Sequence, residues 1–155
     1  MILPRYRVAA STIPSAGKGL YVEEGVAAGA IVVAPDAIPR VYTWEELLAL
    51  PDAEALMPAT VRWFEDRYTA TPEWPDECYI NHAFEPTGLW HLGFVFARSA
   101  LVAGTEITVD YRHLLAPGQV ESFRDAFTQE AIIGFDWRDS LRSSTRELAA
   151  LLDAS

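Results

Sequence analysis

The sequence has 155 residues, of which 50% are hydrophobic and 12% aromatic, so it is long and apolar enough for one domain with its own core. A formal net charge of −10 argues against free DNA or RNA as a partner, because phosphate binding needs a basic face, whereas a basic peptide would be attracted. The single cysteine, Cys78, excludes an internal disulfide and a cysteine-rich zinc site.

The first third of the chain predicts short strands and one short helix. Residues 5–8 and 20–22 are predicted to form short strands, and residues 31–33, β-branched and apolar between Gly29 and Pro35, are predicted to form a third. Thr43 and Glu46 stand three residues apart before a leucine-rich stretch, the spacing of a capping box, in which each side chain bonds the other residue's backbone N–H. A short helix should therefore follow Thr43.

The middle of the chain predicts a second helix and then a loop. After Pro58, the residues Val61, Phe64 and Tyr68 recur at spacings close to the helical period, which favours a helix there. Residues 70–77 contain two prolines and should form a loop.

The second half predicts two strands followed by helices. Leu92, Phe94 and Phe96 alternate with smaller residues, and residues 106–109 are β-branched and apolar, so both stretches read as strands. After Pro117 the apolar residues recur at near-helical spacing, namely at Val120, Phe123, Phe127 and Ile132. Residues 140–152 form an amphipathic terminal helix in this interpretation. Many short strands with few helices indicate an α+β, mainly β, fold.

Three short segments carry the chemistry that the sequence offers. The first, Gly17-Lys18-Gly19-Leu20, lets backbone approach a ligand at a turn entering a strand, although alone it fits an ordinary hairpin turn. The second contains Asn81 and His82, whose amide and imidazole could read an adenine edge or satisfy loop backbone. The histidines have no metal-ligand spacing, so we expect no metal site.

The third segment runs from Ala97-Arg98 to Asp110-Tyr111 and predicts a strand, a turn at Gly104 and a second strand with a polar end. Taken alone, Tyr111 fits a half-buried tyrosine at a strand end. Together, and in this order, the three segments resemble the SET-domain family of protein lysine methyltransferases. The similar region covers residues 4–115, which we take as the SET domain.

The resemblance implies a fold of small curved sheets with a knot-like crossing, S-adenosylmethionine as the cofactor, and methyl transfer to a lysine of a protein or peptide. It implies that backbone at Lys18, Gly19 and Leu20 holds the amino-acid end of the cofactor. It further implies that Asn81 and His82 hold the adenine and nearby groups.

The resemblance also implies that Tyr111 is the catalytic residue, placing its hydroxyl beside the reacting methyl group. Tyr79 and Trp90 are candidates for the aromatic walls of a lysine channel. The stretch 35–78 would be the variable insert that shapes one wall of the substrate groove.

The sequence departs from the family pattern at several points. Ala83-Phe84 replaces the usual Ser-Cys after Asn-His, Pro86-Thr87 replaces Pro-Asn, and Pro35-Asp36 stands in place of Tyr-x-Gly. These changes favour, as the alternative, a non-catalytic SET-like module that binds a basic peptide or the cofactor. A third interpretation is an unrelated α+β interaction protein.

No cysteine cluster follows Tyr111, so another element must cover the cofactor. We expect residues 116–155, a helical C-terminal segment, to complete the cofactor site with Phe135 and Trp137. The alternative is that both rings pin the terminal helix to the core. The apolar runs are too short for a membrane-spanning helix and the N-terminus lacks a signal-peptide pattern, which favours a cytoplasmic protein. The oligomeric state stays open.

Overall fold

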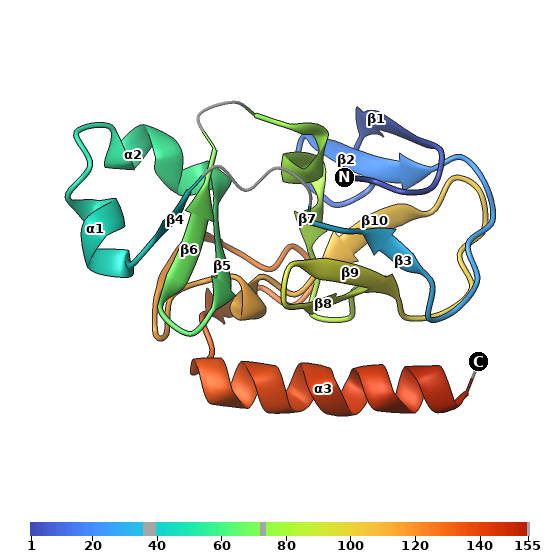
Figure 1. Ribbon diagram of the computed structural model, residues 1–155. Helices are drawn as coiled ribbons and strands as arrows, with labels where there is room; N and C mark the ends of the chain where they lie inside the picture. Colours follow the sequence, from blue (N-terminus) through green and yellow to red (C-terminus); the bar gives the residue numbers. More distant parts are fainter. Residues whose placement is uncertain (36–39, 72–73, 155) are drawn as a thin grey trace.

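The computed structural model describes residues 1–35, 40–71 and 74–154, which form a mixed α+β, mainly β, fold of several short sheets (Figure 1). The strands are β1 (Tyr6–Ala10), β2 (Lys18–Val22), β3 (Ile31–Val33), β4 (Val41–Tyr42), β5 (Thr60–Phe64), β6 (Arg67–Ala70), β7 (Asn81–His82), β8 (Gly88–His91), β9 (Phe94–Ala97), β10 (Glu106–Val109), β11 (Val120–Arg124) and β12 (Ala131–Ile133). The helices are α1 (Trp44–Leu48), α2 (Ala53–Leu56) and α3 (Trp137–Asp153), with 3₁₀ turns η1 (Met57–Ala59), η2 (Asp76–Tyr79) and η3 (Tyr111–His113). The expected fold class is confirmed.

One sheet brings distant parts of the sequence together. Its strand order is β1-β2-β10-β7, and β7 runs parallel to β10 with Asn81 opposite Thr108 and His82 opposite Val109. The Asn-His segment therefore lies beside the segment that ends in Asp110-Tyr111, as the resemblance implies. The three-stranded sheet β3-β9-β8 lies across the core from it.

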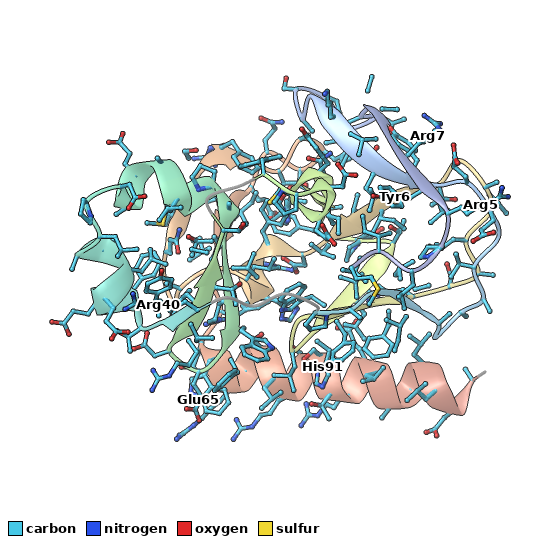
Figure 2. All side chains as sticks on the ribbon, turned by 45° about the horizontal axis from the view of Figure 1, so that its top comes forward. Arg5, Tyr6, Arg7, Arg40, Glu65 and His91 are labelled. Atoms are coloured by element: carbon cyan, nitrogen blue, oxygen red, sulfur yellow. The ribbon has the colours of Figure 1, made fainter. Side chains whose placement is uncertain are left out.

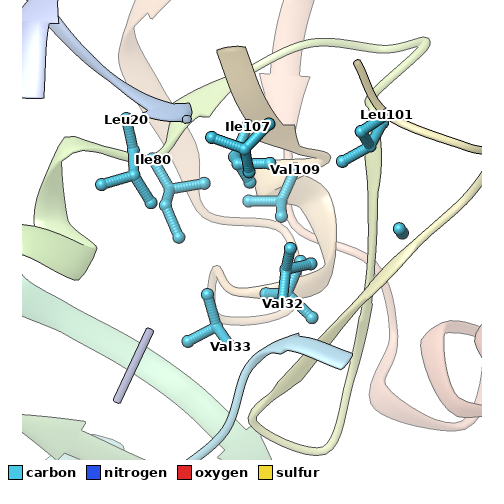
Figure 3. Packing of buried hydrophobic residues seen from close by; sticks show 10 residues of the cluster. Leu20, Val32, Val33, Ile80, Leu101, Ile107 and Val109 are labelled. Atoms are coloured by element: carbon cyan, nitrogen blue, oxygen red, sulfur yellow. The ribbon is translucent and has the colours of Figure 1, made fainter. Parts of the chain in front are cut away.

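The main core is a cluster of aliphatic side chains from these two sheets (Figure 3). Leu20 from β2, Val95 from β9, and Ile107 and Val109 from β10 are each 1% exposed. Burying one such side chain stabilises the fold by about 1.5–3 kcal/mol. The strands predicted around residues 20–22, 31–33 and 106–109 are confirmed, because each supplies β-branched or leucine side chains to this core.

The insert forms a small unit with its own sheet, β4-β6-β5, and its own cluster around Leu47 and Tyr68. The capping box is present: the Thr43 hydroxyl accepts from the Glu46 backbone N–H at 3.1 Å, and the Glu46 carboxylate accepts from the Thr43 backbone N–H at 2.7 Å. Parts of the expected insert, residues 36–39 and 72–73, lie outside the described residues.

The helix predicted after Pro58 is wrong, since β5 and β6 form a hairpin there instead. The sequence pattern is misleading because Arg62 is the buried residue of β5, whereas a hydropathy pattern counts arginine as an exposed polar residue. Its guanidinium donates to the Phe135 carbonyl at 2.8 Å and the His113 carbonyl at 3.3 Å, so hydrogen bonds to distant backbone hold it inside.

The helix predicted directly after Pro117 is also wrong, because β11 and β12 form a second hairpin. Val120, Phe123 and Phe127 are exposed, so their helical spacing does not correspond to a buried face. The segment 116–155 is thus half hairpin and half helix. Leu92 lies in the turn between β8 and β9 rather than in the strand.

The terminal helix α3 is confirmed, but it starts at Trp137, with Asp136 as the N-cap that accepts from the Arg138 backbone N–H at 2.9 Å. It runs along one side of the molecule next to β8 (Figure 1). His91 points toward it (Figure 2) and lies 3.0 Å from the Ser144 hydroxyl. Among the described residues, no helix has the length and apolar character to cross a membrane.

Candidate functional site

A cleft of about 1560 Å³ is lined by residues from the first sheet, from the insert and from the β11–β12 hairpin. Small-molecule pockets usually measure about 300–1,000 Å³, so this cleft has room for a cofactor together with part of a second ligand. Six residues that the sequence singled out line it, namely Lys18, Tyr79, Asn81, His82, Trp90 and Tyr111. The structure therefore brings together most of the candidate residues.

A buried carboxylate, that of Glu106, organises one end of the cleft. It accepts hydrogen bonds from the Ser11 hydroxyl at 2.6 Å, the Thr12 backbone N–H at 2.9 Å and hydroxyl at 2.8 Å, and the Asn81 amide at 3.0 Å. The Tyr21 hydroxyl lies 2.9 Å away. We call these five residues the Glu106 cluster. Burial raises the pKa of Glu106, but the hydrogen bonds outweigh burial and lower it overall, so the group is ionised at neutral pH.

The Glu106 cluster explains the Gly-x-Gly segment. Gly17 has a φ of +74°, a left-handed turn conformation that glycine adopts without strain. A Cβ on Gly19 would overlap the Glu106 carboxylate. Asn81 also donates to the Lys18 carbonyl at 2.7 Å, so the cluster fixes the backbone at Lys18. Leu20 points into the core and is 1% exposed.

Tyr111 lies between β10 and the cleft, in the first turn of η3. Its hydroxyl donates to the Ile80 carbonyl at 2.7 Å, and its ring packs 5.4 Å from the His82 ring and 6.3 Å from the Phe123 ring. Burial, with the nearby Glu121 and Cys78, raises the pKa of Tyr111, so the phenol stays neutral at physiological pH. It can orient a neighbour by hydrogen bonding but cannot act as a base.

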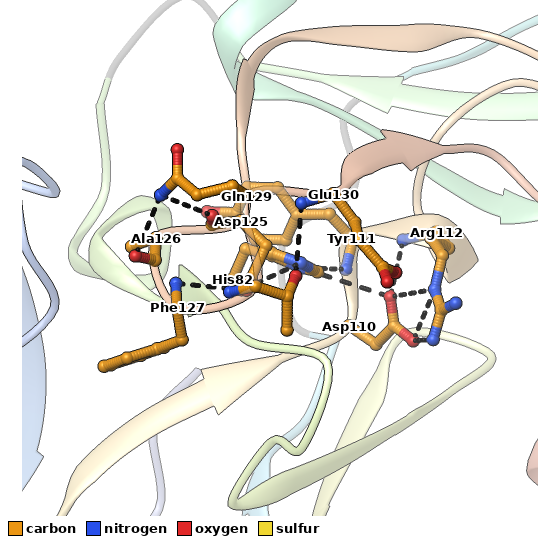
Figure 4. Close-up of polar contacts among 10 residues, drawn as sticks. His82, Asp110, Tyr111, Arg112, Asp125, Ala126, Phe127, Gln129 and Glu130 are labelled. Carbon is orange, nitrogen blue, oxygen red and sulfur yellow. Dashed lines mark hydrogen bonds and ion pairs between the residues drawn. The ribbon is translucent and has the colours of Figure 1, made fainter.

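His82 is buried beside Tyr111 (Figure 4), with a side chain that is 3% exposed. Its Nδ1 accepts from the Tyr111 backbone N–H at 3.1 Å. Burial lowers the pKa of His82, and the carboxylates of Asp110 and Asp125 oppose that shift without cancelling it. The imidazole is therefore neutral at pH 7.

The neighbouring carboxylate, Asp110, is held by Arg112. The guanidinium donates to both Asp110 oxygens, at 2.6–3.0 Å, in a bidentate pair. The same guanidinium lies 4.4 Å from the Phe84 ring centre and 4.6 Å from that of Phe135. Phe84, which replaces the usual cysteine of the family pattern, thus packs on this ion pair and, edge-on, on His82.

The candidate channel residues line the cleft from two sides. The Lys18 ammonium lies 5.5 Å from the Tyr79 ring centre, and the Trp74 ring packs edge-on against Tyr79 at 6.3 Å. Trp90 lies on β8 and also packs against the main core. The face of Tyr79 is therefore already in contact with a cation of the chain itself.

The structure does not bring Phe135 or Trp137 to the cleft. Phe135 donates its backbone N–H to the Arg112 carbonyl at 2.9 Å and packs its ring on His113 at 5.1 Å. Trp137 begins α3 and borders a separate, small cavity next to Arg62 and Ser140. The reason is the close packing at Gly134, where a Cβ would overlap the Ala116 carbonyl oxygen. The chain just before Phe135 therefore lies against the residues that follow η3, and it turns away from the cleft there.

The hairpin β11–β12 reaches the cleft instead, and sequence reasoning missed it. Glu121, Phe123 and Asp125 line the cleft from this hairpin. Asp125 could have predicted the turn of this hairpin, because the aspartate carboxylate favours turns by accepting hydrogen bonds from the backbone N–H groups of the next few residues. Its Oδ1 does accept from Phe127 N–H at 3.1 Å and Thr128 N–H at 2.6 Å.

Comparison with known proteins gives a structural likeness. No family model matches the chain, and none of the curated proteins is similar to it in sequence. The fold is similar to a chain in the crystal structure of an active polycomb repressive complex 2 in the basal state, with a TM-score of 0.55 and 16% identity over 70% of this chain. This chain spans 15% of the length of that chain. At this identity the likeness concerns the fold.

Proposed function

We propose that this chain transfers a methyl group from S-adenosylmethionine to the side-chain amine of a lysine in a protein. The observation that carries the proposal is the position of Tyr111: a neutral phenol at a large cleft, beside the strand of Asn81 and His82 and across from Lys18. The three segments of the SET-domain resemblance meet at that cleft. The likeness in fold to the chain of polycomb repressive complex 2 supports the same assignment.

The residues at the cleft fit the cofactor. The backbone at Lys18, fixed by Asn81, would hold the amino-acid end, and the Lys18 ammonium is close enough to the cleft to pair with a carboxylate there. Asn81 and His82 would lie along the nucleoside part. When bound, S-adenosylmethionine supplies an electrophilic methyl group on a sulfonium.

The chain itself contributes alignment. An in-line displacement needs the amine nitrogen, the methyl carbon and the sulfur to lie on one axis, so catalysis is largely positional. Tyr111 is held by two bonds, its hydroxyl on the Ile80 carbonyl and its backbone N–H on His82, and its phenol oxygen keeps free lone pairs to accept from an amine or a polarised methyl group.

The cleft also suits the nucleophile, which must be a neutral amine. Deprotonating a free lysine, with a pKa near 10.4, costs about 4.6 kcal/mol at pH 7. Aromatic walls such as Tyr79 and Trp90 disfavour the ammonium by desolvation and so reduce that cost. The carboxylates of Glu54, Glu77 and Glu121 also line the cleft and would attract a basic peptide segment before the amine is desolvated.

Calorimetric titration with S-adenosylhomocysteine tests the cofactor assignment. We expect binding by the wild-type chain and weaker binding by Asn81→Ala, because the variant loses the bond that fixes the Lys18 carbonyl. Glu85→Ala, an exposed position four residues further along, serves as the matched control and should bind like wild type. If the wild-type chain does not bind S-adenosylhomocysteine, the cofactor assignment is wrong. Binding without any methyl transfer would identify the non-catalytic module instead.

A further inference from the structure

His82 Nε2 is, among the described residues, the one buried side-chain nitrogen or oxygen that has no hydrogen-bond partner. A buried polar group without a partner costs free energy, so such an atom calls for an explanation. Oδ2 of Asp125 lies 3.8 Å from it, on a side chain that is 2% exposed (Figure 4). That separation is slightly too long for a hydrogen bond.

The hydrogen bonding on the other side of the ring decides which nitrogen carries the proton. A backbone N–H can only donate, so Nδ1, which receives the bond from Tyr111, must be unprotonated. A neutral imidazole then carries its proton on Nε2. The Nε2–H group is therefore a hydrogen-bond donor that faces an acceptor, the Asp125 carboxylate.

Asp125 is arranged so that one oxygen is left for this contact. Its Oδ1 accepts from the backbone N–H groups of Phe127 and Thr128, which builds the turn of the β11–β12 hairpin. Its backbone N–H donates to the Glu130 carbonyl at 3.0 Å. Oδ2 is thus the oxygen directed at His82, and the carboxylate joins the hairpin to the Asn-His strand.

We propose that Asp125 is a positioning residue, which accepts a hydrogen bond from His82 Nε2–H and thereby fixes both the imidazole that holds Tyr111 and the hairpin that lines the cleft. A closure of less than about 1 Å brings the pair to hydrogen-bond distance. The structure then contains a continuous chain of contacts, from Asp125 through His82 to the Tyr111 backbone. The consequence for methyl transfer rests on the proposed function, but the chain of contacts does not.

The charged groups around His82 are consistent with this role. Asp110 Oδ1 lies 4.0 Å from Nδ1, but Arg112 already neutralises that carboxylate through its bidentate pair. Among the ion pairs of the described residues, the one that involves Asp125 is its pair with His82. Asp125 is therefore a carboxylate near the imidazole that no arginine in the described part of the chain pairs with, and its removal should lower the pKa of His82.

Asp125→Asn is the test variant, because the asparagine oxygen can keep the turn bonds of Oδ1 while an NH₂ group replaces the acceptor that faces His82. Asp136→Asn is the matched control, since it makes the same change at the aspartate that caps α3, and asparagine caps helices as well as aspartate does. The ¹⁵N resonances of the imidazole are readily assigned, because the sequence contains three histidines.

Three results are expected from nuclear magnetic resonance on the ligand-free full chain. Wild-type His82 shows the Nε2–H tautomer at pH 7. Asp125→Asn lowers the pKa of His82 further, because the carboxylate that favours the cation is gone. Asp125→Asn also speeds amide exchange of Tyr111 about tenfold more than that of Ala83, whose N–H bonds the Val109 carbonyl. Asp136→Asn leaves all three unchanged.

The proposal is overturned if wild-type His82 carries its proton on Nδ1, a result that needs no variant to fold. It is equally overturned if Asp125→Asn leaves the His82 pKa unchanged, or speeds exchange of Tyr111 and Ala83 alike, which is the behaviour of a turn residue that only stabilises the hairpin. None of these measurements uses cofactor or substrate, so their failure is distinct from failure of the proposed function.

Discussion

Two polar centres at the cleft, the Glu106 cluster and the His82–Asp125 pair, differ in how completely their groups are hydrogen-bonded. In the Glu106 cluster, the carboxylate accepts bonds from Ser11, Thr12 and Asn81, and every contact is 3.0 Å or shorter. At the other centre, His82 Nε2 and the Asp125 carboxylate face each other at 3.8 Å, without a hydrogen bond. A fully hydrogen-bonded network such as the Glu106 cluster fixes the backbone around it. The His82–Asp125 pair lacks its hydrogen bond, so the β11–β12 hairpin can still move toward His82.

The difference assigns distinct tasks to the two centres. The Glu106 cluster joins β2, β7 and β10 to the segment that follows β1, and holds the Lys18 backbone in one position. The His82–Asp125 pair joins a core strand to a two-stranded hairpin in which Val120, Phe123 and Phe127 are exposed. A fixed backbone suits the groups that would hold the cofactor, and a hairpin that can move suits a cover over the cleft.

Removing the Glu106 carboxylate should have the largest effect on stability. Glu106→Ala removes the acceptor of the Thr12 N–H and of the Ser11 and Thr12 hydroxyls, and one acceptor of the Asn81 amide, so we expect a loss of about 3 kcal/mol in the free energy of unfolding. Urea denaturation measures it. Glu24→Ala, which removes an exposed carboxylate paired with Arg5, is the control and should change little. Equal losses in both variants would mean that the Glu106 cluster is not a stabilising centre.

Lowering the pH should separate the two centres. Burial lowers the pKa of His82, and lowers that of His113 to about 4, so below pH 6.5 the unfolded chain binds protons that the folded chain excludes. Stability is therefore lost as the pH falls from 6.5, by about 2 kcal/mol at pH 5 for His113 alone. The pKa of Glu106 is also lowered, so its contribution is present above pH 4.5 and is lost only as the pH falls through the folded value.

Urea denaturation between pH 3 and 8 resolves the two phases. Glu106→Gln should retain the loss between pH 6.5 and 5, which comes from the histidines, and should lose less stability than wild type below pH 4.5. Wild-type stability that stays flat from pH 7 to 5 would contradict the burial of neutral histidines.

A methyl group at Gly19 should disturb the Glu106 cluster directly. The Cβ of Gly19→Ala would overlap the Glu106 carboxylate, so we expect a loss of about 1–3 kcal/mol in stability and weaker binding of S-adenosylhomocysteine. The matched control is Gly25→Ala, where the nearest atom to the new Cβ is the Leu101 carbonyl oxygen at 3.7 Å. Gly19→Ala with wild-type stability would show that the carboxylate can move aside freely.

The smallest expected effect concerns the aromatic rings of the tail. Phe123→Ala removes a ring that contacts Tyr111 at the cleft, and we expect roughly tenfold weaker binding of S-adenosylhomocysteine, the lower end of an aromatic stacking contribution. Phe135→Ala should bind like wild type, because its ring packs on Arg112 and His113 away from the cleft. The reverse pattern would restore Phe135 as the cofactor cover.

The sequence predicts the core strands well and the covering segments poorly, for a physical reason. The strands around Leu20, Val32 and Ile107 bury aliphatic side chains, and local patterns of such residues determine where they form. The hairpins β5–β6 and β11–β12 depend on Arg62, which is buried by distant carbonyl groups, and on Phe123, which is exposed although it is aromatic. Neither the burial of Arg62 nor the exposure of Phe123 follows from local hydropathy.

The candidate site shows the same division. The cleft residues on β7 and at the end of β10 could be found from short motifs, because these motifs mark where two strands meet. Glu106 could not be found in this way, since a buried carboxylate is stable only with donors from Ser11 and Asn81, far away in the sequence. The position of Phe135 depends on Gly134 packing against the Ala116 carbonyl, a contact that no pattern of the tail predicts.

Transfer of a radiolabelled methyl group from S-adenosylmethionine to histones and to a proteome lysate, compared between wild type and Tyr111→Phe, tests the central claim most directly. The variant removes one hydroxyl and keeps the ring. The account predicts lysine-linked label with wild type, faster transfer toward alkaline pH, and a rate about ten- to a hundredfold lower for Tyr111→Phe at unchanged S-adenosylhomocysteine affinity. A folded wild-type chain that binds the cofactor and labels no lysine, or a Tyr111→Phe variant that transfers at the wild-type rate, would contradict it.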